Sequence, residues 1–285
     1  MTGAAGFFGR CLAQLLRSAG KKLVLVDRLS GAETAAGKCI YCDLGNRART
    51  RKLLRDSAPS EIYHLAGVFS ADYAGNYKGN FLPAKNILDS VLALKLKCRV
   101  LLVGSAAEYG APLKNPVAET APLTPVTYYG FAKMLQTRLG EFYHRVYGAD
   151  IVTARVFNLA GPGVSDTLFP GRVSRQIEAY KRGETSCIKV GRLDSWRDYL
   201  MVQEAAAALR VVMDHGRTGE VYNVGSGVPL RMGTLLARML GEAGVPLSAV
   251  ESAPQGGMRP DVYRIYADIA KLLALKTAEA ESRRI

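Results

Sequence analysis

Hydrophobic and polar positions alternate in blocks along the first half of the chain, and these blocks predict strands and helices in turn. Four short runs are almost entirely apolar, as expected of parallel strands buried on both faces. The predicted strands span residues 22–27, 61–66, 98–104 and 150–157. Between them lie amphipathic stretches, which predict helices over 7–19, 46–57, 78–97 and 129–147. Strands that alternate with helices predict a doubly wound parallel α/β sheet.

The pattern becomes less regular after residue 158, where Gly161-Pro162-Gly163 breaks the chain. Helices are predicted over 170–182, 203–214 and 231–243, with strands near 187–190 and at 221–224. The proline-rich stretch 111–127 is predicted to be a loop. We therefore expect a Rossmann domain over 1–158 and a smaller, interleaved C-terminal lobe over 159–285.

Composition narrows the classes of partner. The 285 residues carry 38 Lys+Arg and 25 Asp+Glu, so the formal net charge is +13. The densest basic stretch, residues 47–55, holds no aromatic residues of the kind that stack on bases, so it is interpreted as a solvated helix face. No apolar run reaches the length of a membrane span. We expect neither a nucleic-acid nor a membrane partner.

The five cysteines form an odd set without a visible secretory leader, which favours reduced thiols and a cytoplasmic protein. Cys39 and Cys42 have C-x-x-C spacing. A zinc site would need a second pair of ligands, and none follows. No metal is therefore predicted.

A glycine loop opens the chain. Gly3, Gly6 and Gly9 form a G-x-x-G-x-x-G pattern before the predicted helix 7–19, and glycines at such a turn let a pyrophosphate approach the backbone. Asp27 ends the next predicted strand, 18 residues after Gly9. A carboxylate there accepts hydrogen bonds from ribose hydroxyls, which indicates NAD.

Two further places in the sequence, Arg28 and the pair Asp43 and Leu44, extend this dinucleotide hypothesis. Arg28 follows the ribose-binding carboxylate, and a guanidinium at this place can pair with a 2′-phosphate, so NADP stays open as a cofactor. Asp43 and Leu44 follow a further extended stretch, where an aspartate can meet the adenine amino group.

Tyr129 and Lys133 form a candidate catalytic pair. Four residues apart on a predicted helix, their side chains share one face. A nearby cation favours the anionic form of a phenol, so we expect Tyr129 to exchange a proton with an alcohol or ketone near neutral pH. Ser105 follows a buried strand at the carboxyl end of the sheet and can bond the same substrate oxygen.

Together these motifs resemble the extended short-chain dehydrogenase/reductase family of nucleotide-sugar epimerases, dehydratases and reductases. The resemblance runs from residue 2 to about residue 270, and includes His64-Leu65-Ala66-Gly67, Tyr109-Gly110, Arg155-Val156-Phe157-Asn158, Arg197-Asp198-Tyr199 and Arg259-Pro260-Asp261. It implies that Ser105, Tyr129 and Lys133 are catalytic. It also implies dinucleotide contacts from Phe7, Phe8, Leu65, Ala66 and Gly67, with Tyr129 and Lys133, and substrate diphosphate contacts from Asn158, Arg197 and Arg259.

The resemblance also bears on the reaction. Sugar 4,6-dehydratases of this family carry acidic residues where this chain has Ala106 and Ala107, so dehydration is disfavoured. Glu108 is one place further on and is expected to point elsewhere. Residues 103–110 look most like those of GDP-4-keto-6-deoxy-mannose reductases, which implies a 4-ketoreductase for a nucleotide-diphosphate deoxysugar.

Two other functions stay open: a 4-epimerase that keeps its NAD bound, and a non-catalytic dinucleotide-binding protein. The predicted helices 78–97 and 129–147 resemble the pair through which many family members form homodimers, and Leu88, Leu92 and Leu96 repeat at four-residue spacing. His64 and Arg155, inside apolar strands, are expected to be buried structural groups, and Trp196 a packing residue.

The start of the sequence is abrupt. A Rossmann glycine loop follows a strand at the centre of the sheet, but here only Met1 and Thr2 precede Gly3. We therefore expect the first strand to be missing, which leaves an empty slot in the sheet. The stretch 271–285 likewise lacks the closing segment that the resemblance implies.

Overall fold

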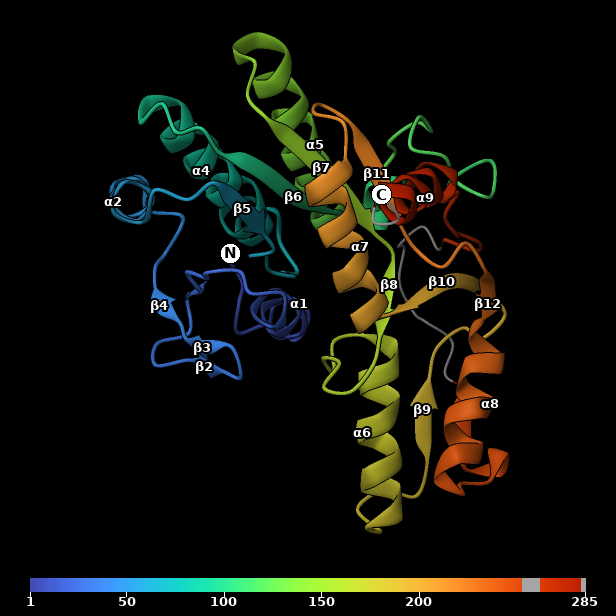
Figure 1. Cartoon of the computed structure of the whole chain (residues 1–285). Coiled ribbons are helices and arrows are strands. Elements are labelled where there is room, and N and C mark those ends of the chain that lie inside the picture. Colours follow the sequence, from blue (N-terminus) through green and yellow to red (C-terminus); the bar gives the residue numbers. More distant parts are fainter. Residues whose placement is uncertain (253–261, 283–285) are drawn as a thin grey trace.

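A twisted parallel sheet forms the centre of the molecule (Figure 1). The computed structural model describes residues 1–252 and 262–282. Strand order across the sheet is β4, β1, the residue Thr2, β5, β6, β7 and β11. The strands are β1 (Val26–Asp27), β4 (Ile40–Tyr41), β5 (Glu61–His64), β6 (Arg99–Ser105), β7 (Ile151–Val156) and β11 (Val221–Val224). This is the predicted doubly wound α/β topology.

The position between β1 and β5 is held by the first two residues of the sequence. Thr2 forms parallel bridges to Val26 on one side and to His64 on the other. Its amide donates to the Tyr63 carbonyl at 3.0 Å, and Val26 donates to the Met1 carbonyl at 3.0 Å. The slot expected from the sequence is therefore occupied at its carboxyl end. Only Val26–Asp27 of the predicted strand 22–27 pairs, because its neighbours, Thr2 and β4, are equally short.

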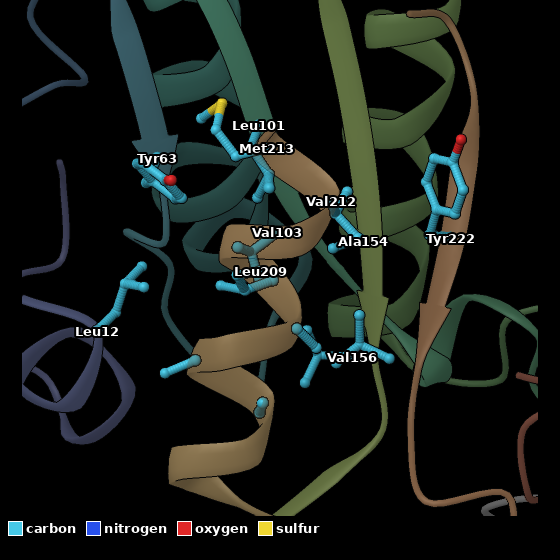
Figure 2. Close-up of a cluster of buried hydrophobic side chains, with 14 of the residues drawn as sticks. Leu12, Tyr63, Leu101, Val103, Ala154, Val156, Leu209, Val212, Met213 and Tyr222 are labelled. Carbon is cyan, nitrogen blue, oxygen red and sulfur yellow. The ribbon is translucent and has the colours of Figure 1, made fainter. Parts of the chain in front are cut away.

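Helices cover both faces of the sheet (Figure 1). One face carries α1 (Phe7–Ser18), α7 (Val202–His215) and α9 (Ala270–Ser282), and the other carries α2 (Arg47–Ser57), α4 (Leu82–Ala93) and α5 (Tyr128–Tyr147). In Figure 2, Leu209 and Val212 of α7 face Val103 of β6 and Ala154 of β7. Burial of this apolar face against the sheet holds the strand ends in place.

The helix predicted over 78–97 begins earlier and ends earlier. It runs through α3 (Tyr73–Asn76), a π-helical turn η1 (Tyr77–Phe81) and α4. The left-handed backbone of Lys95, with φ of 50°, ends it. The predicted loop 111–127 contains isolated bridges only. A short 3-10 turn, η2 (Ala106–Glu108), directly follows β6.

The C-terminal lobe is built on two small sheets beside α6 (Phe169–Lys181) and α8 (Met232–Ala243) (Figure 1). One has the order β12–β10–β8 and the other pairs β13 with β9. Their strands are β8 (Asn158–Ala160), β9 (Ile188–Val190), β10 (Trp196–Met201), β12 (Pro229–Arg231) and β13 (Val250–Ser252). Since α7 and β11 lie on the main sheet, the chain crosses between the two lobes more than once. The boundary at residue 158 remains a proposal.

The remaining elements are small. The hairpin β2 (Glu33–Thr34) and β3 (Gly37–Lys38) follows β1, and the 3-10 turn η3 (Leu247–Ala249) precedes β13. Within the described ranges, no helix has the length and apolarity that crossing a membrane requires. In the same residues, no group of three potential metal-ligating side chains comes together.

Candidate active site

The glycine loop forms a cradle that side chains would fill. Gly3 has φ of +68°, and a Cβ on it would lie 2.8 Å from the Ala66 nitrogen. A Cβ on Gly9 would lie 1.9 Å from the Gly3 carbonyl oxygen. Gly6 is the N-cap of α1 and has no side chain that would cover the first amides of the helix. The loop thus leaves α1 with an open, electropositive N-terminus.

Asp27 closes the other side of this cradle. Its Oδ2 accepts the Ala5 amide at 2.9 Å, and its Oδ1 accepts the amides of Arg28 and Leu29 at 2.7 and 3.1 Å. The carboxylate is therefore fixed at the carboxyl end of β1. Arg28 is exposed beside it.

A cavity of about 340 Å³, called here the glycine-loop cavity, lies over this cradle. It brings together nine of the residues predicted to bind the dinucleotide, namely Gly3, Gly6, Asp27, Arg28, Asp43, Leu44, Leu65, Ala66 and Gly67. Lys78, exposed on the π-helical turn η1, lines it too and was not predicted. Phe7 and Gly9 do not line it; Gly9 instead packs on Gly3.

The central cavity, about 530 Å³, adjoins the glycine-loop cavity through Leu65, Gly67 and Val68. Ser105, Tyr129 and Lys133 all line it, as does Phe8. Ser105 ends β6, whereas the other two come from the first turns of α5, which Thr127 caps through a 3.0 Å bond from the Gly130 amide. The structure therefore brings the three predicted catalytic side chains to one cavity.

Tyr129 is held as a neutral phenol. Burial of its hydroxyl raises the pKa of Tyr129, and a hydrogen bond with the Ser105 side chain opposes that shift only in part. The sequence-based expectation of a phenol made acidic by Lys133 is therefore not met in this structure. A neutral phenol beside a serine hydroxyl is arranged to donate a proton.

Lys133 is buried, and its ammonium is bound by groups of β6 and α5. Its ammonium donates to the Val103 carbonyl at 2.9 Å and to Gln136 Oε1 at 3.2 Å. Burial lowers the pKa of Lys133 to about 8, while the negative charge of Glu108 acts in the opposite direction. These bonds turn the cation toward β6, which explains why it does not make Tyr129 more acidic here.

The part of the described chain that lines the central cavity contains no Asp or Glu. Ala106 and Ala107 do line it, whereas Glu108 points away from it, as predicted, and pairs with Arg155 at 2.7 Å. Proton transfer at the surface of this cavity therefore depends on Tyr129 and Lys133.

A third cavity, about 250 Å³, continues from the central one and is called here the arginine cavity. Asn158, Leu159, Thr167, Leu168 and Arg197 line both. Arg172 and Arg192 line the arginine cavity as well. Three guanidinium groups at one end suit a diphosphate.

The predicted substrate residues have different surroundings. Asn158 donates to the Asp198 carbonyl at 3.0 Å, and Arg197 donates to the Trp196 carbonyl at 2.9 Å. Arg259 lies outside the described residues. Arg172 was missed because it is one basic residue on an exposed helix. Arg192 was not predicted either, although it lies only five residues before Arg197 in the sequence.

The residues predicted to be structural are buried or packed. His64 is fully buried, and burial lowers its pKa to about 3, so the ring is neutral. Its Nδ1 lies 2.8 Å from the Thr2 hydroxyl. Trp196 stacks under the Arg264 guanidinium, with 5.7 Å between the cation and the ring centroid.

A dinucleotide fits the glycine-loop cavity on the structure's own terms. The loop keeps open the space that a Cβ would fill, the first amides of α1 face it, and a fixed carboxylate lies at its far end. These are the donors that a pyrophosphate needs and the acceptor that ribose hydroxyls need.

Comparison with known proteins gives a consistent picture. Residues 1–225 match the model of the NAD dependent epimerase/dehydratase family. A GDP-6-deoxy-D-mannose reductase of Pseudomonas aeruginosa is 29% identical over 222 residues, 75% of this chain and 73% of that protein. A putative UDP-glucose 4-epimerase of Methanocaldococcus jannaschii is 25% identical over 283 residues, 96% of this chain and 91% of that protein.

A solved structure is similar over nearly the whole chain. It is described as RMD from Pseudomonas aeruginosa complexed with NADPH, and it superposes with a TM-score of 0.82 at 26% identity. The match covers 96% of this chain and 90% of that one.

Proposed function

Because the chain belongs to the NAD-dependent epimerase/dehydratase family, we propose that it is a nucleotide-sugar 4-ketoreductase that uses NADH or NADPH. The substrate is a nucleotide-diphosphate deoxysugar with a keto group at C4. The observation that carries the proposal is the central cavity, in which Tyr129 is a neutral acid and the described lining has no carboxylate. Removal of water from a sugar needs further acid–base groups, whereas reduction of a ketone needs one proton donor.

The chain's own residues divide the work. The α1 amides, Asp27 and Lys133 would hold the dinucleotide, which when bound supplies the reducing equivalents. Ser105 donates a hydrogen bond to the C4 oxygen and orients it toward Tyr129. Tyr129 then gives its proton to that oxygen as the ketone becomes an alcohol. Lys133 has a pKa of about 8, so near neutral pH its ammonium can leave the Val103 carbonyl and stabilise the phenolate that remains.

The arginine cavity would bind the diphosphate of the substrate. Arg197 lines both this cavity and the central one, so it lies where the diphosphate meets the sugar. Arg172 and Arg192 then contact the outer phosphate or the nucleoside, and Asn158 lines the passage between the cavities. Arg259 is retained as a proposed substrate residue from the sequence alone.

A panel of 4-keto nucleotide sugars tests the proposal, with loss of absorbance of NADH or NADPH as the readout. Net oxidation of the cofactor that disappears in Tyr129→Phe is expected. Conversion of a nucleotide sugar without net oxidation would instead establish a 4-epimerase with retained NAD. That second candidate is favoured by the similarity to the M. jannaschii protein over 96% of this chain. Binding of dinucleotide without any turnover would leave a non-catalytic protein.

We also propose a homodimer, formed through α4 and α5. On α5, the apolar residues Phe142, Val146 and Tyr147 are exposed by 42%, 51% and 54%, which is unusual for a helix packed on a core. Sedimentation at several protein concentrations checks this, with Phe142→Glu as the disrupting variant. A monomer at all concentrations would contradict it. The five cysteines are free, which is consistent with the proposed cytoplasmic location.

A further inference from the structure

Glu108 is a buried carboxylate immediately behind the reaction centre that the proposed reaction does not use. Its side chain is 0% exposed and does not line the central cavity, so it does not touch a substrate there. It ends the turn η2, which starts at Ser105. A charge buried this completely is costly unless several groups bind it.

Both oxygens of the carboxylate are bound. Oε1 accepts the Ser105 amide at 2.9 Å, and Oε2 accepts Nε of Arg155 at 2.7 Å. Burial raises the pKa of Glu108, while the charge of Arg155 and the hydrogen bond from the Ser105 amide oppose that shift. The Ser105 hydroxyl accepts the Ala107 amide at 3.2 Å. Ser105 is therefore fixed through its main chain by Glu108 and through its side chain by the same turn.

The same carboxylate fits closely between β6 and α5. A Cβ on Gly104 would lie 2.4 Å from Glu108 Oε1 and 3.3 Å from the Thr137 hydroxyl. A Cβ on Gly130 would lie 2.3 Å from the Ala107 carbonyl oxygen. The first turns of α5, which carry Tyr129 and Lys133, thus pack directly on the turn that Glu108 ends.

Glu108 also sets the field at the reaction centre. Its negative charge raises the pKa of both Tyr129 and Lys133, which keeps the first neutral and the second charged. The other ionisable groups packed around Lys133 are Tyr129 on its own helix and His64 of β5, which is neutral. Arg155 of β7 lies on the far side of the carboxylate.

We propose that Glu108 is a positioning residue: with Arg155 it fixes Ser105 from behind, and it places a buried carboxylate against the first turns of α5, which carry Tyr129 and Lys133. The expected effect on turnover rests on the proposed function, whereas the position of Ser105 and the pKa of Lys133 do not depend on it. Arg155 extends the arrangement by donating to the Tyr109 hydroxyl at 3.1 Å and to the Glu119 carbonyl at 3.0 Å. The pair thereby joins the reaction centre to the loop 111–127.

The direct test is the pKa of Lys133 in Glu108→Gln, measured without substrate. Lysine side-chain NMR signals followed against pH give this value, and the signal that disappears in Lys133→Met is that of Lys133. Glutamine keeps the size of the side chain and removes its charge. We expect the pKa of Lys133 to fall below its value of about 8 by about half a unit to one unit, because a neighbouring anion has been lost.

Glu119→Gln is the matched control. Its carboxylate accepts the Asn223 amide at 2.9 Å and belongs to the same network, but it is not among the groups that act on Lys133. We expect it to leave the pKa of Lys133 unchanged. An equal fall in both variants, or no fall in Glu108→Gln, would overturn the proposal.

The unpaired Arg155 is expected to destabilise Glu108→Gln. If that variant does not fold, the double variant Glu108→Gln/Arg155→Gln removes both charges, and a smaller fall in the pKa of Lys133 is expected, because the loss of the Arg155 cation partly offsets the loss of the anion. An unchanged value in the folded double variant contradicts the proposal as firmly as one in the single variant.

Kinetics separate this proposal from the proposed function. In an active enzyme, the basic limb of the kcat profile against pH should move to lower pH by the same amount, while the KM for the nucleotide sugar stays within about twofold. A lower active fraction with an unmoved profile is what a purely structural role would produce. If the wild-type protein reduces none of the keto sugars, the proposed function fails, yet the NMR result still decides the role of Glu108.

Discussion

The two ends of the cavity system are built in different ways. At the reaction centre, Ser105 and Lys133 are held by hydrogen bonds to β6 and to the turn that follows it, and Lys133 is only 3% exposed. In the arginine cavity, Arg172 and Arg192 stand on the surface, and Arg192 pairs with Asp194 only two residues away. The difference teaches that the proton-transfer groups are preorganised by the core, whereas two of the three proposed anion-binding arginines lie on the surface. Substitutions at the first end should lower kcat, and substitutions at the second should raise KM.

Tyr129→Phe should have the largest effect, because it removes the proton donor of the rigid end. We expect kcat to fall by about 10²–10⁴-fold, with dinucleotide affinity within about threefold of wild type. Turnover assays and fluorescence titration with NADH measure the two quantities. An unchanged kcat would contradict the role of the reaction centre in proton transfer, since the proton would have to come from another group.

Arg197→Met tests the arginine cavity. Loss of a charged hydrogen bond of about 1.5–3 kcal/mol corresponds to a rise in KM for the nucleotide sugar of about 10–100-fold, with kcat nearly constant. Arg138→Met is the control, because Arg138 is an exposed α5 residue that pairs with Glu141 and does not line any of the three cavities. If Arg197→Met lowered kcat and left KM alone, the two ends would not be functionally distinct.

The pH dependence of kcat should reflect Lys133 at the reaction centre and not the arginine cavity. Lys133 has a pKa of about 8 because it is buried, so it is charged below that value and neutral above it. We expect kcat to decline above about pH 8, by up to about tenfold per pH unit. The KM for the sugar should change less over the same range, as the arginines keep their charge. A kcat that stays flat to high pH would show that the ammonium form of Lys133 is not needed.

Asp27→Asn should produce the smallest change. The amide still occupies the cradle, but it no longer repels a 2′-phosphate. We expect the ratio of kcat/KM for NADPH to that for NADH to rise by several-fold, up to about tenfold. Arg28→Ala should move the ratio in the other direction. Steady-state kinetics with both cofactors gives the ratios, and an unchanged ratio in both variants would exclude these two residues from cofactor choice.

The sequence predicted the main sheet better than the smaller lobe, and the reason is physical. Strands buried on both faces, such as β6 and β7, appear as continuous apolar runs. The signals for α5, its N-cap and the spacing of Tyr129 and Lys133, lie within a few residues of one another in the sequence. The short strands β8, β10 and β12 are half-buried and pair with partners far away in sequence, so no local pattern marks them. Their pairing is decided by tertiary contacts.

The site shows the same division. The spacing of Tyr129 and Lys133 and the place of Ser105 after a buried strand pointed to these three residues, and all three line the central cavity. Lys78 and Arg172 were not found, because each is a single cation on a helix surface until the fold places it at a cavity. The sequence also could not predict that the pKa of Tyr129 is raised rather than lowered. It depends on burial and on the Val103 carbonyl, which takes the Lys133 ammonium away from the phenol.

The three cavities form a chain with the central one as the link, since it shares walls with each of the other two. One consequence concerns inhibition. In the proposed reaction the two ligands occupy opposite ends and meet in the central cavity, so a single molecule that tethers a dinucleotide fragment to a nucleotide-sugar fragment would fill both ends at once. Binding of one fragment would then hold the other fragment at a high effective concentration near its own cavity. The affinity of the tethered molecule would rise steeply if a short linker fitted through the central cavity.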